Sequence, residues 1–225
     1  ILSRRRFLTR TAAAGAAVAV PYAITSSALG GEDRPAASQR ITMGCIGLGG
    51  RGTVNMETFL GQPDVQIVAL CDVDAGSTRY EDAWHRGLTP AQEKVASRYA
   101  AQRTAGTYRG VSGYRDFREL LARDDIDAVC ISTPDHWHAP LVVAAAKAGK
   151  DIYCEKPLSL TVRDGQAMVA AVRRYGRVFQ CGSQRRSDAK CRHSCELVRN
   201  GRIGRLHTVR VGLPGGHWIR NNAKK

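Results

Sequence analysis

The chain has 225 residues, of which 43% are hydrophobic and 24% are charged, so it is long and apolar enough to bury a core. Its net charge of +14 comes from the two ends: residues 1–28 contain four Arg without an acid, and residues 177–225 contain twelve Lys or Arg against two acids. No recognition motif or set of base-stacking aromatics accompanies these basic residues, which argues against nucleic-acid binding. A solvated face or a partner surface explains the charge better.

The cysteines indicate neither disulfides nor a metal site. Of the seven, five lie inside apolar runs, where a free thiol behaves as a small hydrophobic side chain. An odd number without framework spacing argues against disulfide pairing. Cys191, His193 and Cys195 resemble half of a metal site, but no second pair with ligand spacing follows, so we expect no bound metal.

The N-terminal residues resemble an export signal. Ser3–Arg10 (SRRRFLTR) matches the twin-arginine pattern, an Ala-rich stretch over 12–24 follows, and Ser26–Ala28 offers small residues for cleavage. The stretch is too short and too weakly apolar for a stable membrane span. We therefore predict a twin-arginine signal peptide over 1–28, export by the twin-arginine machinery and a periplasmic or other extracytoplasmic location. A basic, disordered tail is the alternative. Residues 29–39 are predicted to be a linker.

From residue 40 onward, short apolar runs alternate with amphipathic stretches, as in βαβ units. The apolar runs predict strands over 41–46, 65–71, 128–132, 151–154 and 178–181. The amphipathic stretches predict helices over 51–60, 91–102, 114–122, 139–148 and 160–175. Short apolar strands flanked by helices imply a parallel sheet that is covered on both faces. We predict an α/β fold, a Rossmann-type doubly wound parallel sheet, over residues 40–183.

A glycine-rich turn directly follows the first predicted strand and opens the first predicted helix. It has the spacing G-x-G-x-x-G and consists of Gly47, Leu48, Gly49, Gly50, Arg51 and Gly52. In such a loop the first glycine permits a tight turn, the second lets the backbone approach a pyrophosphate, and the third allows close packing of helix on strand. The helix N-terminus donates N–H groups to the anion. A mononucleotide P-loop does not fit, because no Lys precedes Thr53.

An acidic residue completes this pattern at the end of the second strand. Asp72 follows Gly52 by twenty residues, where a carboxylate accepts hydrogen bonds from ribose hydroxyls. Strand, loop, helix, strand and acid in this order predict a dinucleotide-binding site. Asp72 favours NAD over NADP, because it would repel the 2′-phosphate of NADP, while Arg51 on the loop could soften that preference.

Beyond the loop, four stretches resemble the Gfo/Idh/MocA family of oxidoreductases. They are Cys71–Asp74 (CDVD), Ser132–His138 (STPDHWH), Ala148–Pro157 (AGKDIYCEKP) and Gly201–Gly204 (GRIG). The Glu-Lys-Pro segment is the most specific of them, and the resemblance covers residues 41–213. It implies a Rossmann domain followed by a second α/β domain whose open sheet lines a sugar pocket.

The resemblance also implies roles for individual residues. Thr133–Pro134 would line the dinucleotide near the middle of the sheet, and His138 would support that turn or the cofactor. Trp137 would form a wall on the nicotinamide side or anchor the surface. Glu155 would meet the nicotinamide ribose, and Lys156 would face both the nicotinamide and the substrate hydroxyl as the catalytic residue.

The resemblance implies a dehydrogenase that transfers a hydride between NAD, or less favourably NADP, and a sugar, cyclitol or related polyol. One alternative is a glycosidase of the same family that keeps NAD bound, which the Glu-Lys-Pro segment disfavours. The other is a non-catalytic dinucleotide-binding protein, which Lys156 disfavours.

The second domain is expected to be incomplete. Residues 184–225 predict only its beginning, with one strand over 206–211, and the family's catalytic His and Asp are not found there. Ile1 also stands where an initiator Met is expected. We therefore expect a fragment that is inactive alone, and a possible homo-oligomer contact through the missing sheet.

Overall fold

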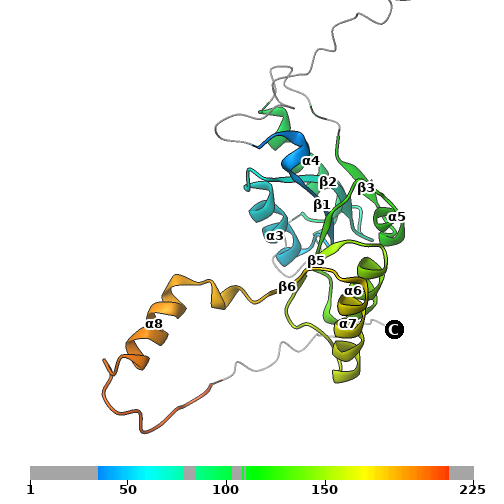
Figure 1. Cartoon of the computed structure of the whole chain (residues 1–225). Helices are drawn as coiled ribbons and strands as arrows, with labels where there is room; N and C mark the ends of the chain where they lie inside the picture. The colour runs from blue at the N-terminus through cyan, green and yellow to red at the C-terminus, as the bar shows by residue number, and fades with distance from the viewer. Residues whose placement is uncertain (1–34, 79–84, 103–107, 109, 213–225) are drawn as a thin grey trace, which may run out of the picture. The chain divides into compact units, whose positions relative to one another are not determined.

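The computed structural model describes residues 35–78, 85–102, 108 and 110–212 (Figure 1). The chain divides into two compact units, residues 1–182 and residues 183–225. The predicted signal peptide and residues 29–34 of the predicted linker lie outside the described residues. Within the part that is described, no helix is long and apolar enough to cross a membrane.

A parallel sheet of six strands forms the centre of the first unit. Its spatial order is β3-β2-β1-β4-β5-β6, and each neighbouring pair is parallel. The chain winds outward in both directions from β1, as in a doubly wound α/β domain, which confirms the predicted fold class. The strands are β1 (Ile41–Ile46), β2 (Val65–Cys71), β3 (Ser112–Tyr114), β4 (Ala128–Ile131), β5 (Asp151–Glu155) and β6 (Phe179–Gly182).

Helices cover both faces of this sheet (Figure 1). On one face, α3 (Gly50–Leu60) and α4 (Leu88–Ala100) close one cluster of buried apolar side chains. On the other face, α5 (Phe117–Leu121), α6 (His138–Lys147) and α7 (Val162–Tyr175) close a second cluster. Because both faces are covered, the central strands are almost continuously apolar.

Local signals explain where the last helix of this unit begins and ends. Thr161 and Asp164 form a capping box, in which the Thr161 side chain accepts a hydrogen bond from the Asp164 N–H and the Asp164 carboxylate accepts one from the Thr161 N–H. Gly176 ends α7 in the left-handed conformation, with φ +61°. The cap shortens the helix that was predicted over 160–175 by two residues.

One predicted helix boundary is wrong at the edge of the sheet. Tyr114, predicted to begin a helix, instead ends the strand β3, and α5 begins at Phe117. The side chain of Asp116 marks the true start, because it accepts a hydrogen bond from the Arg118 N–H at 2.9 Å. Strand β3 has three residues and no apolar alternation, so its sequence carries no strand signal.

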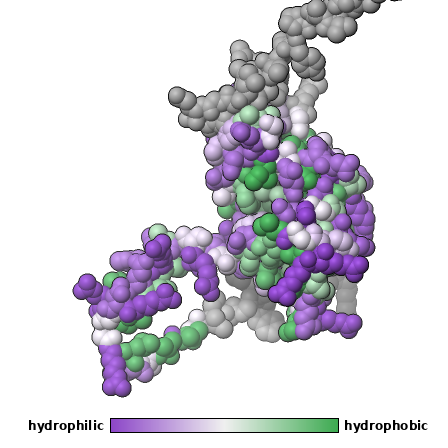
Figure 2. Space-filling view, in the orientation of Figure 1, coloured by the Kyte–Doolittle hydropathy of each residue, from purple (hydrophilic) through white to green (hydrophobic). Residues whose placement is uncertain are grey.

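The second unit differs from its predicted structure. It contains α8 (Ala189–Arg199), which begins at the N-cap Asp188. Residues 206–212 have no regular structure, so the strand predicted over 206–211 is wrong. A strand needs a neighbour that pairs with its N–H and C=O groups, and its apolar residues Leu206 and Val209 remain exposed. Figure 2 shows this unit largely in the colour of hydrophilic residues.

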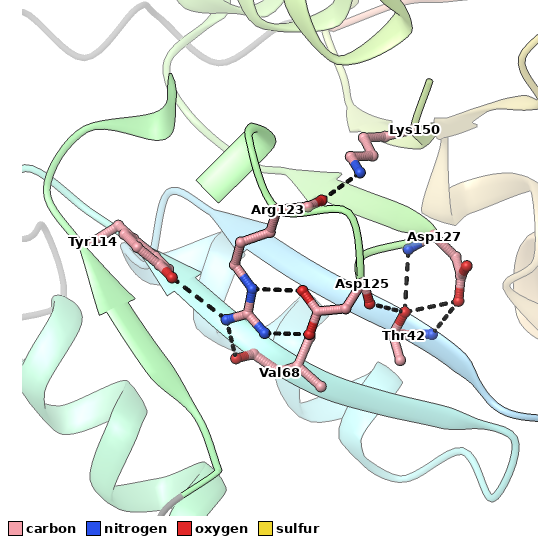
Figure 3. Close-up of polar contacts among 7 residues, drawn as sticks. All are labelled: Thr42, Val68, Tyr114, Arg123, Asp125, Asp127 and Lys150. Carbon is pink, nitrogen blue, oxygen red and sulfur yellow. Dashed lines mark hydrogen bonds and ion pairs between the residues drawn. The ribbon is translucent and has the colours of Figure 1, made fainter. Parts of the chain in front are cut away.

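A network of polar side chains joins the strands at their amino ends (Figure 3). The Thr42 N–H donates to Asp127 Oδ2 at 2.8 Å, which ties β1 to the start of β4. Arg123 donates from two nitrogens to the carboxylate of Asp125. The buried ammonium of Lys150 donates to the Arg123 carbonyl at 2.6 Å, so this lysine of the Ala-Gly-Lys segment has a structural role.

We predict that Lys150→Met lowers the free energy of unfolding by about 1–3 kcal/mol, because the Arg123 carbonyl would lose its donor in a region that water does not reach easily. Urea unfolding followed by circular dichroism measures the effect. The matched control is Lys147→Met, since Lys147 is exposed on α6, and it should change the stability by less than about 0.5 kcal/mol. Equal midpoints for both variants would contradict this role of Lys150.

Candidate functional site

The glycine-rich loop lies against the turn that follows β4. Gly47 has φ +86°, and a Cβ there would lie 2.8 Å from the backbone C and O atoms of Ser132. A Cβ on Gly52 would lie 1.9 Å from the carbonyl oxygen of Gly47. Both obstacles are backbone atoms, which cannot turn aside, so the loop closes only with glycine at these two positions.

This loop presents the N-terminus of α3 at the carboxyl edge of the sheet. Gly49 is the N-cap and has no side chain to occupy the first amides of the helix. Leu48 contributes a fully buried side chain to the core, while Gly50 is half-buried and Arg51 is exposed. Free N–H groups at a helix N-terminus bind anions, so the loop has the geometry that a pyrophosphate requires.

Asp72 lies directly after β2 and fastens the loop. Its Oδ2 accepts a hydrogen bond from the Leu48 N–H at 2.6 Å, and its Oδ1 accepts one from the Asp74 N–H at 2.9 Å. Burial raises the pKa of this carboxyl, and the hydrogen bonds from Asp74 and Leu48 partly offset that rise. Each oxygen retains a second lone pair, and the residue lines the adjacent cavity.

A cavity of about 570 Å³ opens at the carboxyl edge of β1, β2 and β4, a size that suits a small-molecule site. Asp72 and Arg115 are among its polar residues, and the rings of Phe117 and Trp137 meet edge to face with centroids 6.4 Å apart. Trp137 therefore lines the same cavity as Asp72 and packs against α5, while its place beside the nicotinamide stays a prediction. Neither Arg115 nor Phe117 was predicted, because only the fold brings them here.

Thr133 and Pro134 line the same cavity. The Thr133 hydroxyl is the one buried side-chain polar atom without a hydrogen-bond partner among the described residues. Buried polar groups are normally paired, so a ligand with a polar atom at this point would complete the site. The glycine-rich loop, the Asp72 carboxylate and this hydroxyl together fit a dinucleotide that crosses the edge of the sheet between β2 and β4.

His138 is placed differently from the cavity-lining residues. It is the first residue of α6, and its side chain is 1% exposed. Its Nδ1 lies 2.6 Å from the Pro157 carbonyl oxygen, and its Nε2 lies 2.8 Å from that of Thr133. Of the two predicted roles, the structure supports contact with the Thr133 turn, since both ring nitrogens face protein atoms.

Glu155 ends β5 with a buried carboxylate that the protein itself satisfies. Its Oε1 accepts a hydrogen bond from Asn55 Nδ2 at 3.0 Å, and its Oε2 accepts one from the Lys156 N–H at 3.0 Å. Asn55 also donates to Ser132 Oγ at 3.0 Å. Asn55 was not predicted as a site residue, and it links α3 to the ends of β4 and β5.

Lys156 follows β5 at the same edge of the sheet as the cavity, and its side chain is exposed. Its backbone is fixed on one side by the bond to Glu155 and is followed by Pro157 through a cis peptide bond. Among the described residues, no group of three His, Cys, Asp or Glu lies close enough to hold a metal ion.

Residues 41–183 match the profile of the Gfo/Idh/MocA oxidoreductases, described as a family with an NAD-binding Rossmann fold. The chain is 33% identical over 171 residues to a glycosyl hydrolase family 109 protein of Saccharopolyspora erythraea, covering 71% of this chain and 34% of the relative. It is 32% identical over 169 residues to the myo-inositol 2-dehydrogenase of Thermotoga maritima, covering 75% and 44%.

The fold is also shared with a solved scyllo-inositol dehydrogenase from Lactobacillus casei, which contains NAD(H) and scyllo-inositol. The TM-score is 0.55 at 23% identity, over 73% of this chain and 42% of that one. This likeness shows the fold alone. The chain spans between about a third and less than half of the length of these relatives.

We predict that Asp72→Ala weakens the binding of NAD more than that of NADP. The adenosine ribose of NAD would lose a charged hydrogen-bond acceptor, whereas the 2′-phosphate of NADP would be freed from the repulsion of the carboxylate. The expected loss for NAD is about 1.5–3 kcal/mol. Calorimetric titration of both cofactors measures it, with Asp64→Ala, an exposed acid before β2, as the control. If the ratio of the two affinities stays the same, Asp72 does not hold the ribose.

Proposed function

This chain belongs to the Gfo/Idh/MocA oxidoreductases, and we propose that it serves a hydride transfer between NAD and a sugar, cyclitol or related polyol. The observation that carries the proposal is the set of groups at one edge of the sheet. The glycine-rich loop, Asp72 and the unpaired Thr133 hydroxyl surround one cavity, and Lys156 follows the strand beside β4. Open α/β sheets bind their ligands at this edge.

The binding part of the function is assigned to backbone and carboxylate groups. The N–H groups at the start of α3 would hold the pyrophosphate, and the glycine-rich loop allows its close approach. Asp72 would accept from the adenosine ribose, and the hydroxyl of Thr133 would pair with the dinucleotide. When bound, NAD supplies the hydride acceptor or donor.

We assign to Lys156 the transfer of the proton of the substrate hydroxyl. In the oxidation direction its neutral amine would accept the proton of the substrate hydroxyl as the hydride passes to NAD, and in the reverse direction its ammonium would return that proton to the oxygen. The buried Glu155, held by Asn55, fixes the Lys156 backbone through the N–H bond, so the lysine leaves the sheet from a rigid point. A rigid backbone at this position limits the entropy lost in aligning the ammonium with the substrate.

We predict that Lys156→Ala in the complete gene product leaves NAD affinity within a few-fold and lowers turnover by roughly 10²–10⁴. Lys156→Arg should not restore turnover, because a planar guanidinium does not replace a compact donor that sheds a proton. Stopped-flow measurement of NADH formation with a confirmed polyol tests both variants, and Lys147→Ala is the control. Near-normal turnover in either variant would leave Lys156 with a binding role only.

A glycosidase of the same family is the second candidate, favoured by the 33% identity to the glycosyl hydrolase family 109 protein. Such an enzyme would keep its NAD through the reaction and release a hydrolysed sugar. The two candidates differ in one measurement: the dehydrogenase accumulates NADH from added NAD and a polyol, whereas the glycosidase hydrolyses an aryl glycoside without net NADH.

We also propose export by the twin-arginine route. The residues concerned lie outside the described part of the chain, so the support is the sequence pattern alone. A double substitution Arg4→Lys and Arg5→Lys should hold the protein in the cytoplasm, while Arg6→Lys, one position further, should leave export intact. Fractionation of cells followed by immunoblotting measures the distribution. Periplasmic protein in the double variant would rule out this signal.

A further inference from the structure

His138 bridges two turns that belong to different strands. One is the Thr133 turn, residues 133–134 after β4, and the other is the Lys156 turn, residues 156–157 after β5. The ring lies between their carbonyl oxygens, with Nδ1 2.6 Å from Pro157 and Nε2 2.8 Å from Thr133. Since the side chain is 1% exposed, water is poorly placed to replace either contact.

The chemistry of the two partners makes this bridge specific. A carbonyl oxygen only accepts, so a neutral imidazole, which carries one ring hydrogen, donates to one of the two carbonyls, and the bridge has two hydrogen bonds only when both ring nitrogens carry a hydrogen. A buried carbonyl that loses its donor costs more than an ordinary surface hydrogen bond gains. An apolar residue of similar size would fill the space but leave two turns unsupported.

Both turns carry groups of the proposed site. The Thr133 turn lines the cavity, contains the unpaired hydroxyl, and supports the glycine-rich loop, because Gly47 packs directly against Ser132 and Thr133. The Lys156 turn carries the ammonium assigned to the substrate oxygen. The imidazole is therefore the link through which the position of one turn constrains the other.

We propose that His138 is a positioning residue that sets the distance between the dinucleotide cavity and Lys156. It is not among the residues that line the cavity, and it acts through the two backbone carbonyls. The inference rests on the proposed function for its consequence, but the bridge itself is a property of the chain without cofactor.

Two substitutions cut the bridge at opposite ends. The side-chain nitrogen of Gln stands as many bonds from the backbone as Nε2, so His138→Gln retains a donor to Thr133 and loses the one to Pro157. The nitrogen of Asn corresponds in the same way to Nδ1, so His138→Asn retains the donor to Pro157 and loses the one to Thr133. His138→Phe fills the space with neither donor.

Hydrogen exchange of the cofactor-free chain, read by mass spectrometry, tests the bridge. In His138→Gln, exchange should rise about tenfold over residues 156–160 and stay near the wild-type rate over 132–137. In His138→Asn the two segments should reverse. If both variants loosen both segments equally, or neither segment, His138 only fills the core and the proposal is wrong.

The effect of the bridge on the site is measured as the affinity for two ligands, NADH and ADP-ribose. ADP-ribose lacks the nicotinamide. His138→Gln should bind ADP-ribose within about twofold of wild type but NADH about tenfold more weakly, whereas a merely structural loss would weaken both equally. If the wild-type chain binds neither ligand, the proposed function fails. The exchange pattern then still decides for or against the bridge.

Discussion

The site depends on a backbone contact that excludes every side chain. Gly47 and Gly52 bring the loop after β1 so close that a Cβ on Gly52 would lie 1.9 Å from the Gly47 carbonyl oxygen, and Gly47 itself packs on Ser132. This contact sets the N-terminus of α3 beside the end of β4. Asp72 then closes the loop from β2 through the Leu48 N–H. The cavity of about 570 Å³ opens where the ends of these three strands converge.

The polar groups at the two edges of the sheet have different roles. At the amino edge, Thr42 pairs with Asp127 and Lys150 donates to the Arg123 carbonyl, and these contacts join the strands. At the carboxyl edge, Asp72 lines a cavity, and the buried Thr133 hydroxyl has no hydrogen-bond partner among the described residues. Two lysines six residues apart therefore have different environments: Lys150 is buried and paired, and Lys156 is exposed.

Much of this arrangement can be predicted from the sequence, because the strong signals are local. The apolar run over residues 65–71 predicted strand β2 with its observed bounds. The glycine spacing after β1 predicted the loop that leads into α3. Strand β3 was not predicted, since its three residues gain their structure from β2 and not from an apolar pattern. Asn55 was not predicted as a site residue, and the contacts of His138 with two turns were not predicted. The hydrogen-bond partners Glu155 and Pro157 are distant from them in the sequence. The strand predicted over 206–211 failed for lack of a pairing neighbour.

The proposed function requires that the cavity between Asp72 and Thr133 receives the adenosine half of NAD. The most direct test is a crystal structure of the chain grown with NAD. We expect ribose hydroxyls within hydrogen-bonding distance of the Asp72 carboxylate, the pyrophosphate at the first amides of α3, and a polar atom of the dinucleotide paired with Thr133 Oγ1. A dinucleotide bound elsewhere on the sheet, or one that leaves the Thr133 hydroxyl unpaired, would contradict the claim.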